Sequence, residues 1–188
     1  MKRKKPIWAF CFIIMRNSNL GRMDSMKKFP EGELHISYSQ ITVFNKGLEN
    51  PYSDWTDKHI NQGFVWREGT VSFGTLSDSL CKIEVILGGE ITASAEAIRS
   101  IVVPFTTADT GITISSILSK EYNFVIPAGS YELLFEAFPL EPPSENDFFK
   151  VQYSFTFAES KSPKARILKH DGDLLSPETL LMTGEAAV

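Results

Sequence analysis

The sequence predicts an all-β protein, an antiparallel β-sandwich or barrel-like fold with one short helical insert. About eight or nine strand-like runs follow one another at short spacings, and several of them alternate apolar and polar residues with period two, as half-buried strands do. Fourteen phenylalanines and many β-branched residues favour a pleated, half-buried surface. Neither the spacing of βαβ units nor a repeat of about 20–50 residues appears, which argues against a parallel sheet and a solenoid.

The 188 residues suit one domain with tails. We expect a basic leader over residues 1–28, a β-sandwich domain over residues 29–158 and a C-terminal tail over residues 159–188. In the tail we expect a strand at 165–169, then a short helix capped by Ser176, with disordered final residues.

The leader holds eight Lys or Arg and one Asp, a charge of +7. Its apolar run of nine residues, Ile7 to Met15, is far short of the roughly 20 needed to span a bilayer. Three interpretations stay open: a dispensable extension from a mis-assigned start, with Met23 or Met26 as the true one; an anchor that associates weakly with an anionic membrane surface; or a signal peptide.

Residues 29–188 hold eleven Lys or Arg and twenty-two Asp or Glu, a charge of −11. Binding to nucleic acid needs clustered cations, so direct contact with nucleic acid is not expected. An acidic body suits a basic protein partner, although acidity can also serve solubility alone. The two cysteines make no disulfide framework, and Cys81 is expected to be a buried thiol.

The first strand-like run, residues 34–44, changes phase after Ser39. Either one extra residue near Ser39–Gln40 shifts the later side chains to the opposite face, or the strand is covered on both faces by its end. A helical insert follows at residues 53–63, with Ser53 or Asp54 as its cap and Gly63 after its last turn. Residues 64–73 read as a hairpin turning at Glu68-Gly69.

Later strands follow from alternation or from β-branched residues. They are residues 80–87, with Cys81, Ile83, Val85 and Leu87 toward the core; 99–105, where Pro104 marks an end or an edge; 112–114; 122–126; 131–138, with Leu133, Phe135 and Ala137 on one face; and 149–157. Residues 122–138 read as a hairpin around a type I turn at 126–129.

The segments ISYSQITVF, DWTDKHINQG and GTVSF, then VPFTTADTGITISSILSKEYNFVIPAGSYELLFEAFP, resemble the competence protein J family in the same order. The resemblance covers roughly residues 34–157. It implies an intracellular protein inhibitor of a DNA-entry nuclease used in competence, and it does not identify the residues that touch the nuclease.

Two surfaces are candidates for binding a partner. The first combines aromatic and acidic residues: Asp54, Trp55, Asp57, Trp66 and Glu68. The second is the Pro-rich acidic loop with Glu141, Glu145 and Asp147. As alternatives, the tryptophans pin the helix to the sheet, Asp54 and Asp57 are caps, and the loop is only solvated.

Catalysis is not expected. His59 and its neighbouring acids could form a carboxylate–imidazole pair, but Asp57, two residues away on a helix, points elsewhere. His35 has no recognisable partner, and the two acids after His170 are too few for a calcium loop. The zinc, phosphate-binding and serine-hydrolase patterns are missing from the sequence, so we expect neither a cofactor nor a metal.

The leading hypothesis is a stoichiometric inhibitor of a competence-associated DNA-entry nuclease, acting through its acidic surface on a basic nuclease. It would be cytoplasmic, and membrane-associated through its partner. The alternatives are a non-catalytic β-sandwich that binds carbohydrate or lipid, and a hydrolase that uses His59 and Asp54.

Overall fold

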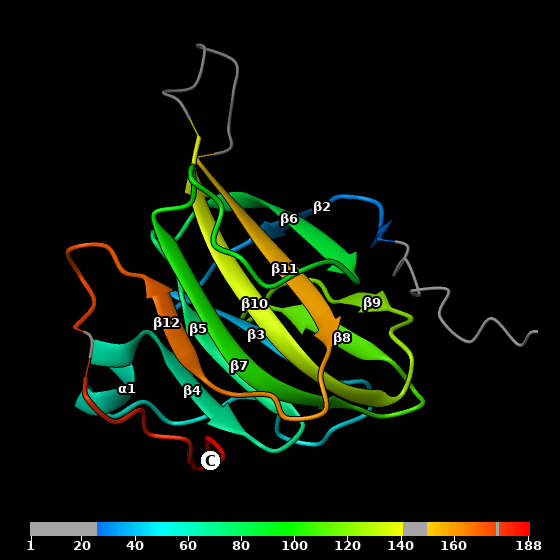
Figure 1. Ribbon diagram of the computed structural model, residues 1–188. Helices are drawn as coiled ribbons and strands as arrows, with labels where there is room; N and C mark the ends of the chain where they lie inside the picture. The colour runs from blue at the N-terminus through cyan, green and yellow to red at the C-terminus, as the bar shows by residue number, and fades with distance from the viewer. Residues whose placement is uncertain (1–25, 141–149, 176) are drawn as a thin grey trace, which may run out of the picture.

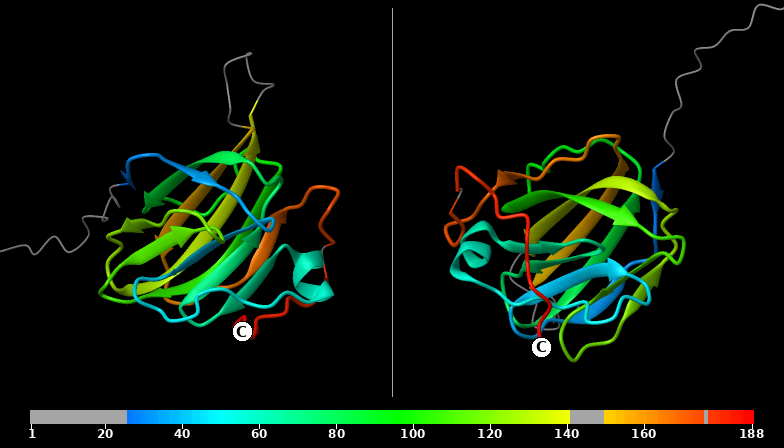
Figure 2. Two further views of the ribbon diagram at one scale, coloured as in Figure 1. Left: turned by 180° about the vertical axis from the view of Figure 1, so that it is seen from behind. Right: turned by 90° about the horizontal axis from the view of Figure 1, so that it is seen from below.

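The computed structural model describes residues 26–140, 150–175 and 177–188, and it is a sandwich of two β-sheets (Figure 1). The all-β sandwich with one short helical insert is confirmed. Helix α1 (Asp57–Gln62) lies at one corner, beside the edge of the smaller sheet, and the C-terminal segment passes below it (Figure 2).

The larger sheet has the strand order β1–β6–β11–β10–β7–β12, and β2 also pairs with β6. Its pairs are antiparallel except β6–β11, which is parallel. Its strands are β1 (Lys27–Lys28), β2 (Gly32–His35), β6 (Leu80–Leu87), β7 (Arg99–Thr107), β10 (Gly129–Pro139), β11 (Val151–Glu159) and β12 (Arg166–Lys169).

The smaller sheet is antiparallel throughout, in the order β4–β5–β3–β8–β9. Its strands are β3 (Gln40–Asn45), β4 (Phe64–Arg67), β5 (Thr70–Gly74), β8 (Ile112–Ser115) and β9 (Tyr122–Phe124). The β4–β5 hairpin confirms the turn at Glu68-Gly69, where Gly69 has a φ of 75°.

Stacked aromatic rings join the two sheets. Phe73 of β5 stacks on Phe135 of β10, with ring centroids 4.4 Å apart and planes 8° apart. Phe135 also meets Tyr153 and Phe155 of β11, each at 5.6 Å between centroids. All four rings are fully buried, and each contributes about 1.5–3 kcal/mol by leaving water.

The alternation predicted for two strands of the larger sheet is confirmed. In β6, Cys81 and Ile83 are fully buried, and in β10, Leu133, Phe135 and Ala137 face the core. Burial raises the pKa of the Cys81 thiol to about 12, as expected for an unreactive core cysteine.

Residues 34–44 are not one strand. β2 ends at His35 in the larger sheet, and β3 begins at Gln40 in the smaller one. Between them Tyr38 and Ser39 have positive φ angles of 57° and 50°. The change of phase marks a tight crossing between the sheets rather than an extra residue within a strand. The other alternative is right for β3, which is buried on both faces.

The hairpin predicted over residues 122–138 is wrong. β9 pairs with β8 in the smaller sheet, whereas β10 pairs with β7 and β11 in the larger one. The chain therefore crosses between the sheets at residues 125–128. The Thr107 and Tyr131 hydroxyls both donate to the Pro127 carbonyl, at 2.5 and 3.0 Å, and hold the crossing in place.

Pro104 does not end its strand, since β7 continues to Thr107. The edge interpretation holds locally: β12 pairs with β7 only as far as Val102, so Pro104 lies beyond the last β12 partner. This part of β7 is open to a contact from outside the larger sheet.

Helix α1 is shorter than predicted, and its N-cap is Thr56 instead of Ser53 or Asp54. The Thr56 N–H donates to Nδ1 of His59 at 3.2 Å, the reciprocal half of a capping box. Gly63 ends the helix as predicted, with a φ of 81°.

In the C-terminal tail, the predicted strand is present as β12, whereas the last described residues, 177–188, contain no helix. They lie against the segment before α1, with the Asp54 N–H donating to Glu185 O at 3.0 Å and the Ala187 N–H to Tyr52 O at 3.1 Å. Ser176, the leader up to residue 25 and the acidic loop at 141–149 lie outside the described residues.

Replacing Phe135 with alanine should lower the free energy of unfolding by about 3–5 kcal/mol, because it removes the ring that both sheets share. Urea unfolding followed by circular dichroism measures the change. Val125→Ala is the matched control, since Val125 is 78% exposed and should lose less than about 0.5 kcal/mol. A loss below about 1 kcal/mol for Phe135→Ala would contradict the role of the stack.

Candidate functional site

The predicted binding residues fall into separate places. Asp54, Trp55 and Asp57 lie at the start of α1, while Trp66 lies on β4 and Glu68 in the turn that follows. Trp55 and Trp66 line different grooves. Glu141, Glu145 and Asp147 lie outside the described residues.

The groove beside Trp55 has a volume of about 410 Å³ and a largely apolar lining. We call it the Trp55 groove; the residues that line it include Tyr38, Trp55, Ile60, Arg99, Asp173 and Leu174. Tyr38 is 68% exposed and Ile60 is 55% exposed. Clusters of large, solvent-exposed apolar side chains are typical of surfaces that bind another protein.

Trp55 forms one wall of this groove and is also held by the smaller sheet. Its indole Nε1 donates to the buried Oε1 of Gln40 on β3 at 3.1 Å. The bond fixes the ring while leaving it half-exposed. A fixed aromatic ring can anchor a partner at a low cost in side-chain entropy.

One acidic side chain lines the Trp55 groove, a second bonds to one of its lining residues, and two more lie close to Trp55 in the sequence. Asp54 and Asp57 are exposed at the start of α1, and Asp173 lines the groove. Asp78 is exposed beside Ser39 and accepts from the Ser39 N–H at 2.7 Å. The exposed Lys58 on α1 is a cation in the same region. An apolar centre with a charged rim is the usual arrangement of a protein interface.

The cation at the base of the groove is neutralised. Arg99 is 3% exposed, and its guanidinium meets Asp171 at 2.7 Å from Nη2 and 3.0 Å from Nε. Its Nη1 also donates to Gly74 O at 2.6 Å. These bonds make the base rigid and leave the rim carboxylates to set the sign of the charge.

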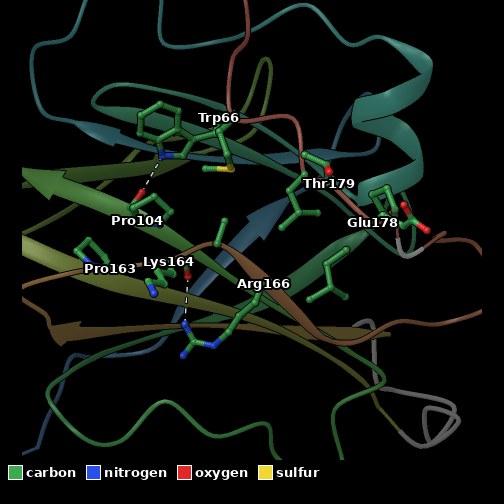
Figure 3. A pocket seen from close by; sticks show the side chains of 12 residues that line it. Trp66, Pro104, Pro163, Lys164, Arg166, Glu178 and Thr179 are labelled. Carbon is green, nitrogen blue, oxygen red and sulfur yellow. Dashed lines mark hydrogen bonds between the residues drawn. The ribbon is translucent and has the colours of Figure 1, made fainter.

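A second groove, of about 700 Å³, lies beside Trp66 (Figure 3). The Trp66 indole donates to Pro104 O at 2.7 Å, at the open part of β7. Lys164 and Arg166 of the β12 segment form one side, and the C-terminal segment with Glu178 and Thr179 forms another. Trp66 therefore joins β4 to β7, a contact between the two sheets and not the predicted contact between the helix and a sheet.

Arg166 of this groove belongs to a paired ion cluster. Its Nη1 and Nη2 donate to the two Glu132 carboxylate oxygens at 2.6 and 2.8 Å. These hydrogen bonds hold the pKa of Glu132 below its ordinary value of 4.5, although burial alone would raise it. The pair fastens β12 to β10 across β7.

His59 is not placed to act as a general base. The ring is 3% exposed, and its Nδ1 accepts from the Thr56 N–H. The proton therefore lies on Nε2, which donates to Thr183 O at 2.9 Å. Both ring nitrogens have structural partners, so His59 orders the start of the helix and the tail.

Across residues 26–140, 150–175 and 177–188, no group of three or more His, Cys, Asp or Glu side chains is arranged to hold a metal ion. Within the same ranges, no helix has the length and apolar character needed to cross a bilayer.

Sequence reasoning missed six residues of the Trp55 groove and its rim: Tyr38, Ile60, Asp78, Arg99, Asp173 and Leu174. Tyr38 and Asp173 come from segments distant in sequence, and only the fold brings them to α1. Ile60 could have been found, because a helical wheel places it beside the face that holds the buried His59 and Gln62.

Comparison with known proteins gives consistent results. Residues 33–158 match the family described as Competence protein J (ComJ). A curated relative from Bacillus subtilis (strain 168), named DNA-entry nuclease inhibitor, is 35% identical over 116 residues, which are 62% of this chain and 87% of the relative.

Two solved structures share the fold. The crystal structure of ComJ, inhibitor of the DNA degrading activity of NucA, from Bacillus subtilis, has a TM-score of 0.64 and 31% identity, covering 72% of this chain and 98% of that chain. The structure of Crocagin biosynthetic gene J has a TM-score of 0.50 and 15% identity, covering 73% of this chain and 99% of that chain. The second likeness concerns the fold alone.

Glu132→Gln should destabilise the protein at neutral pH and lose this effect in acid. Since the folded-state pKa of Glu132 is depressed, its stabilisation is present above the ordinary value of 4.5 and disappears as the pH falls through the folded-state pKa. Urea midpoints of the wild type and variant, compared near pH 7 and near pH 3, should converge at the lower pH. A difference that stays constant would contradict the pairing. Glu121→Gln, at an exposed position, is the control.

Proposed function

Because the chain belongs to the competence protein J family, we propose that it is a protein inhibitor of a DNA-degrading nuclease, which it binds stoichiometrically. The inhibitory roles named for its curated relative and for the solved ComJ structure support this proposal. The match spans nearly the full length of that structure, so the part of the fold that inhibits there has a counterpart here.

The Trp55 groove is the surface that we propose for the nuclease. Asp173 lines the groove beside the exposed Tyr38 and Ile60, and the exposed Asp78 bonds to Ser39, another lining residue. Together with Asp54 and Asp57, which are exposed close to Trp55 in the sequence, this arrangement carries the proposal. A nuclease that grips the DNA backbone needs a cationic surface. Acids around an apolar anchor suit that surface, and their occupancy would exclude DNA.

The chain itself is proposed to be non-catalytic and not to bind nucleic acid. His59, the strongest candidate for a general base, uses both ring nitrogens in structural hydrogen bonds. The charge of −11 over residues 29–188 would repel a polyanion. We place the protein in the cytoplasm, where its nuclease partner or residues 1–28 would bring it to a membrane surface.

A titration against the nuclease NucA tests the function directly. Increasing amounts of the full chain are added to a fixed amount of nuclease, and DNA cleavage is followed. The expected result is complete inhibition near a fixed molar ratio, weaker at high salt because exposed charges are screened. Full cleavage at a large excess of folded protein would overturn the proposal.

The double variant Asp54→Lys, Asp57→Lys should weaken inhibition by about 10- to 100-fold at low salt, chiefly through slower association. The gap from wild type should narrow as salt rises. Inhibition constants at two salt concentrations measure the effect. Glu121→Lys is the matched control, because Glu121 precedes β9, at the edge of the smaller sheet opposite β4. Glu68→Lys shows whether the β4–β5 turn takes part.

Ile60→Ala should raise the dissociation constant for the nuclease by about tenfold, through faster dissociation, while stability changes by less than about 0.5 kcal/mol. The reason is that Ile60 is an exposed apolar residue that lines the proposed surface. Surface plasmon resonance gives the rates, and Val125→Ala provides an equally exposed apolar control. Unchanged binding here and in the charge-reversal double variant would exclude the Trp55 groove as the interface.

A further inference from the structure

The C-terminal segment binds the rest of the protein mainly through its backbone. Residues 181–187 run extended past α1 and the segment before it (Figure 1). The bonds join Gln62 Oε1 to Leu181 N (2.8 Å), Gln62 Nε2 to Leu181 O (3.0 Å), His59 Nε2 to Thr183 O (2.9 Å), Asp54 N to Glu185 O (3.0 Å) and Ala187 N to Tyr52 O (3.1 Å).

Gln62 makes two of these contacts, because its side-chain amide bonds to both the N–H and the C=O of Leu181. The side chain is 1% exposed, and its Nε2 also donates to Phe64 O at 2.9 Å, which fixes the amide plane. A fixed amide that accepts from one N–H and donates to the same residue's C=O recognises extended backbone of any sequence.

The contacts follow the period of a strand. Residues 181, 183 and 185 turn their carbonyls toward the body, and Ala186 forms an antiparallel bridge with Ser53. Addition of an extended peptide to backbone groups at an edge is a recurring mode of peptide recognition. We call the receiving surface, residues 52–54 with His59 and Gln62, the backbone track.

Side chains of the segment add a sequence requirement. Leu180 and Met182 pack against the hydrophobic core. A Cβ on Gly184 would lie 2.6 Å from Val65 Cγ2 and 3.3 Å from Trp66 O, so a larger residue cannot sit there without displacement. The track with β4 therefore accepts an apolar pair followed by a glycine.

The two sides of this contact differ in origin. The backbone track lies within residues 33–158, the range that matches the family, and residues 181–187 lie outside it. The receiving surface thus lies within the range that matches the family, whereas the segment that fills it lies outside that range.

We propose that the backbone track is a peptide-binding site for an extended segment with the pattern Leu-Leu-Met-Thr-Gly, and that residues 180–187 are its resident, exchangeable ligand. The proposed occupant is a separate peptide with the sequence of residues 180–187. The track shares Asp54 with the surface proposed for the nuclease, through the backbone N–H of that residue, and the proposal of a peptide site does not rest on nuclease inhibition.

The test uses the full chain with Gly184→Val, which should release its own segment. A fluorescein-labelled peptide of residues 177–188 is the probe, and fluorescence anisotropy measures its binding. The variant should bind the peptide at least about tenfold more tightly than the wild type, whose site is already occupied. A peptide that itself carries Gly184→Val, and a scrambled peptide, should bind neither protein.

Hydrogen exchange at the Leu181 and Ala187 amides shows whether the segment is released. Faster exchange at both in the Gly184→Val protein, together with tight peptide binding, supports the site. Unchanged exchange would overturn it, because Gly184 would then not be required. Released segment without peptide binding, in a protein with wild-type circular dichroism, would also overturn it, as would equal binding to wild type. Adding Gln62→Ala to the Gly184→Val variant should weaken binding of the peptide by about tenfold, because the hydrogen bonds from the Gln62 amide to residue 181 are lost.

Discussion

Stacking of Phe73 on Phe135 is the contact on which the rest of the molecule depends. It fixes β5 against β10, and β5 in turn carries β4 by the tight turn at Gly69. Helix α1 leads directly into β4, so its position relative to the larger sheet is inherited from that stack. The Trp55 groove has Gly74 of β5 and Arg99 of β7 at its base for the same reason.

Trp55 and Trp66 have different structural roles at this corner of the sandwich. Trp66 bonds to Pro104 and closes the smaller sheet onto the open part of β7, while Trp55 bonds to Gln40 and keeps one side toward solvent. His59 joins the start of α1 to the tail through its two nitrogens. Asp54 and Asp57, at the start of α1, therefore lie on a corner of the sandwich that is held by both sheets and by the C-terminal segment.

Local patterns in the sequence correctly predict those elements that are determined by local interactions. Glu68-Gly69 predicted a hairpin because a two-residue turn needs a positive φ, and the alternation in residues 80–87 predicted which face of β6 is buried. The crossings at Tyr38–Ser39 and at 125–128 cannot be identified from the sequence, because a proline–glycine run or a change of phase occurs both at a turn within one sheet and at a crossing between two sheets. Only part of the Trp55 groove is predictable from the sequence, since Tyr38 and Asp173 are distant from α1 in the sequence and reach it only through tertiary contacts.

The parallel pairing of β6 with β11 has a consequence for how the chain acquires its fold. Ser154 lies opposite Glu84, 70 residues earlier, and no hairpin can bring such partners together. Closing so long a loop costs entropy before any contact repays it, so this pairing belongs to a slow, late stage of folding. During synthesis β6 leaves the ribosome long before β11 exists, and that flank of β6 stays unpaired until then. While residues 88–150 are made, the nascent chain therefore carries an unpaired flank of β6, and unpaired strand edges favour aggregation.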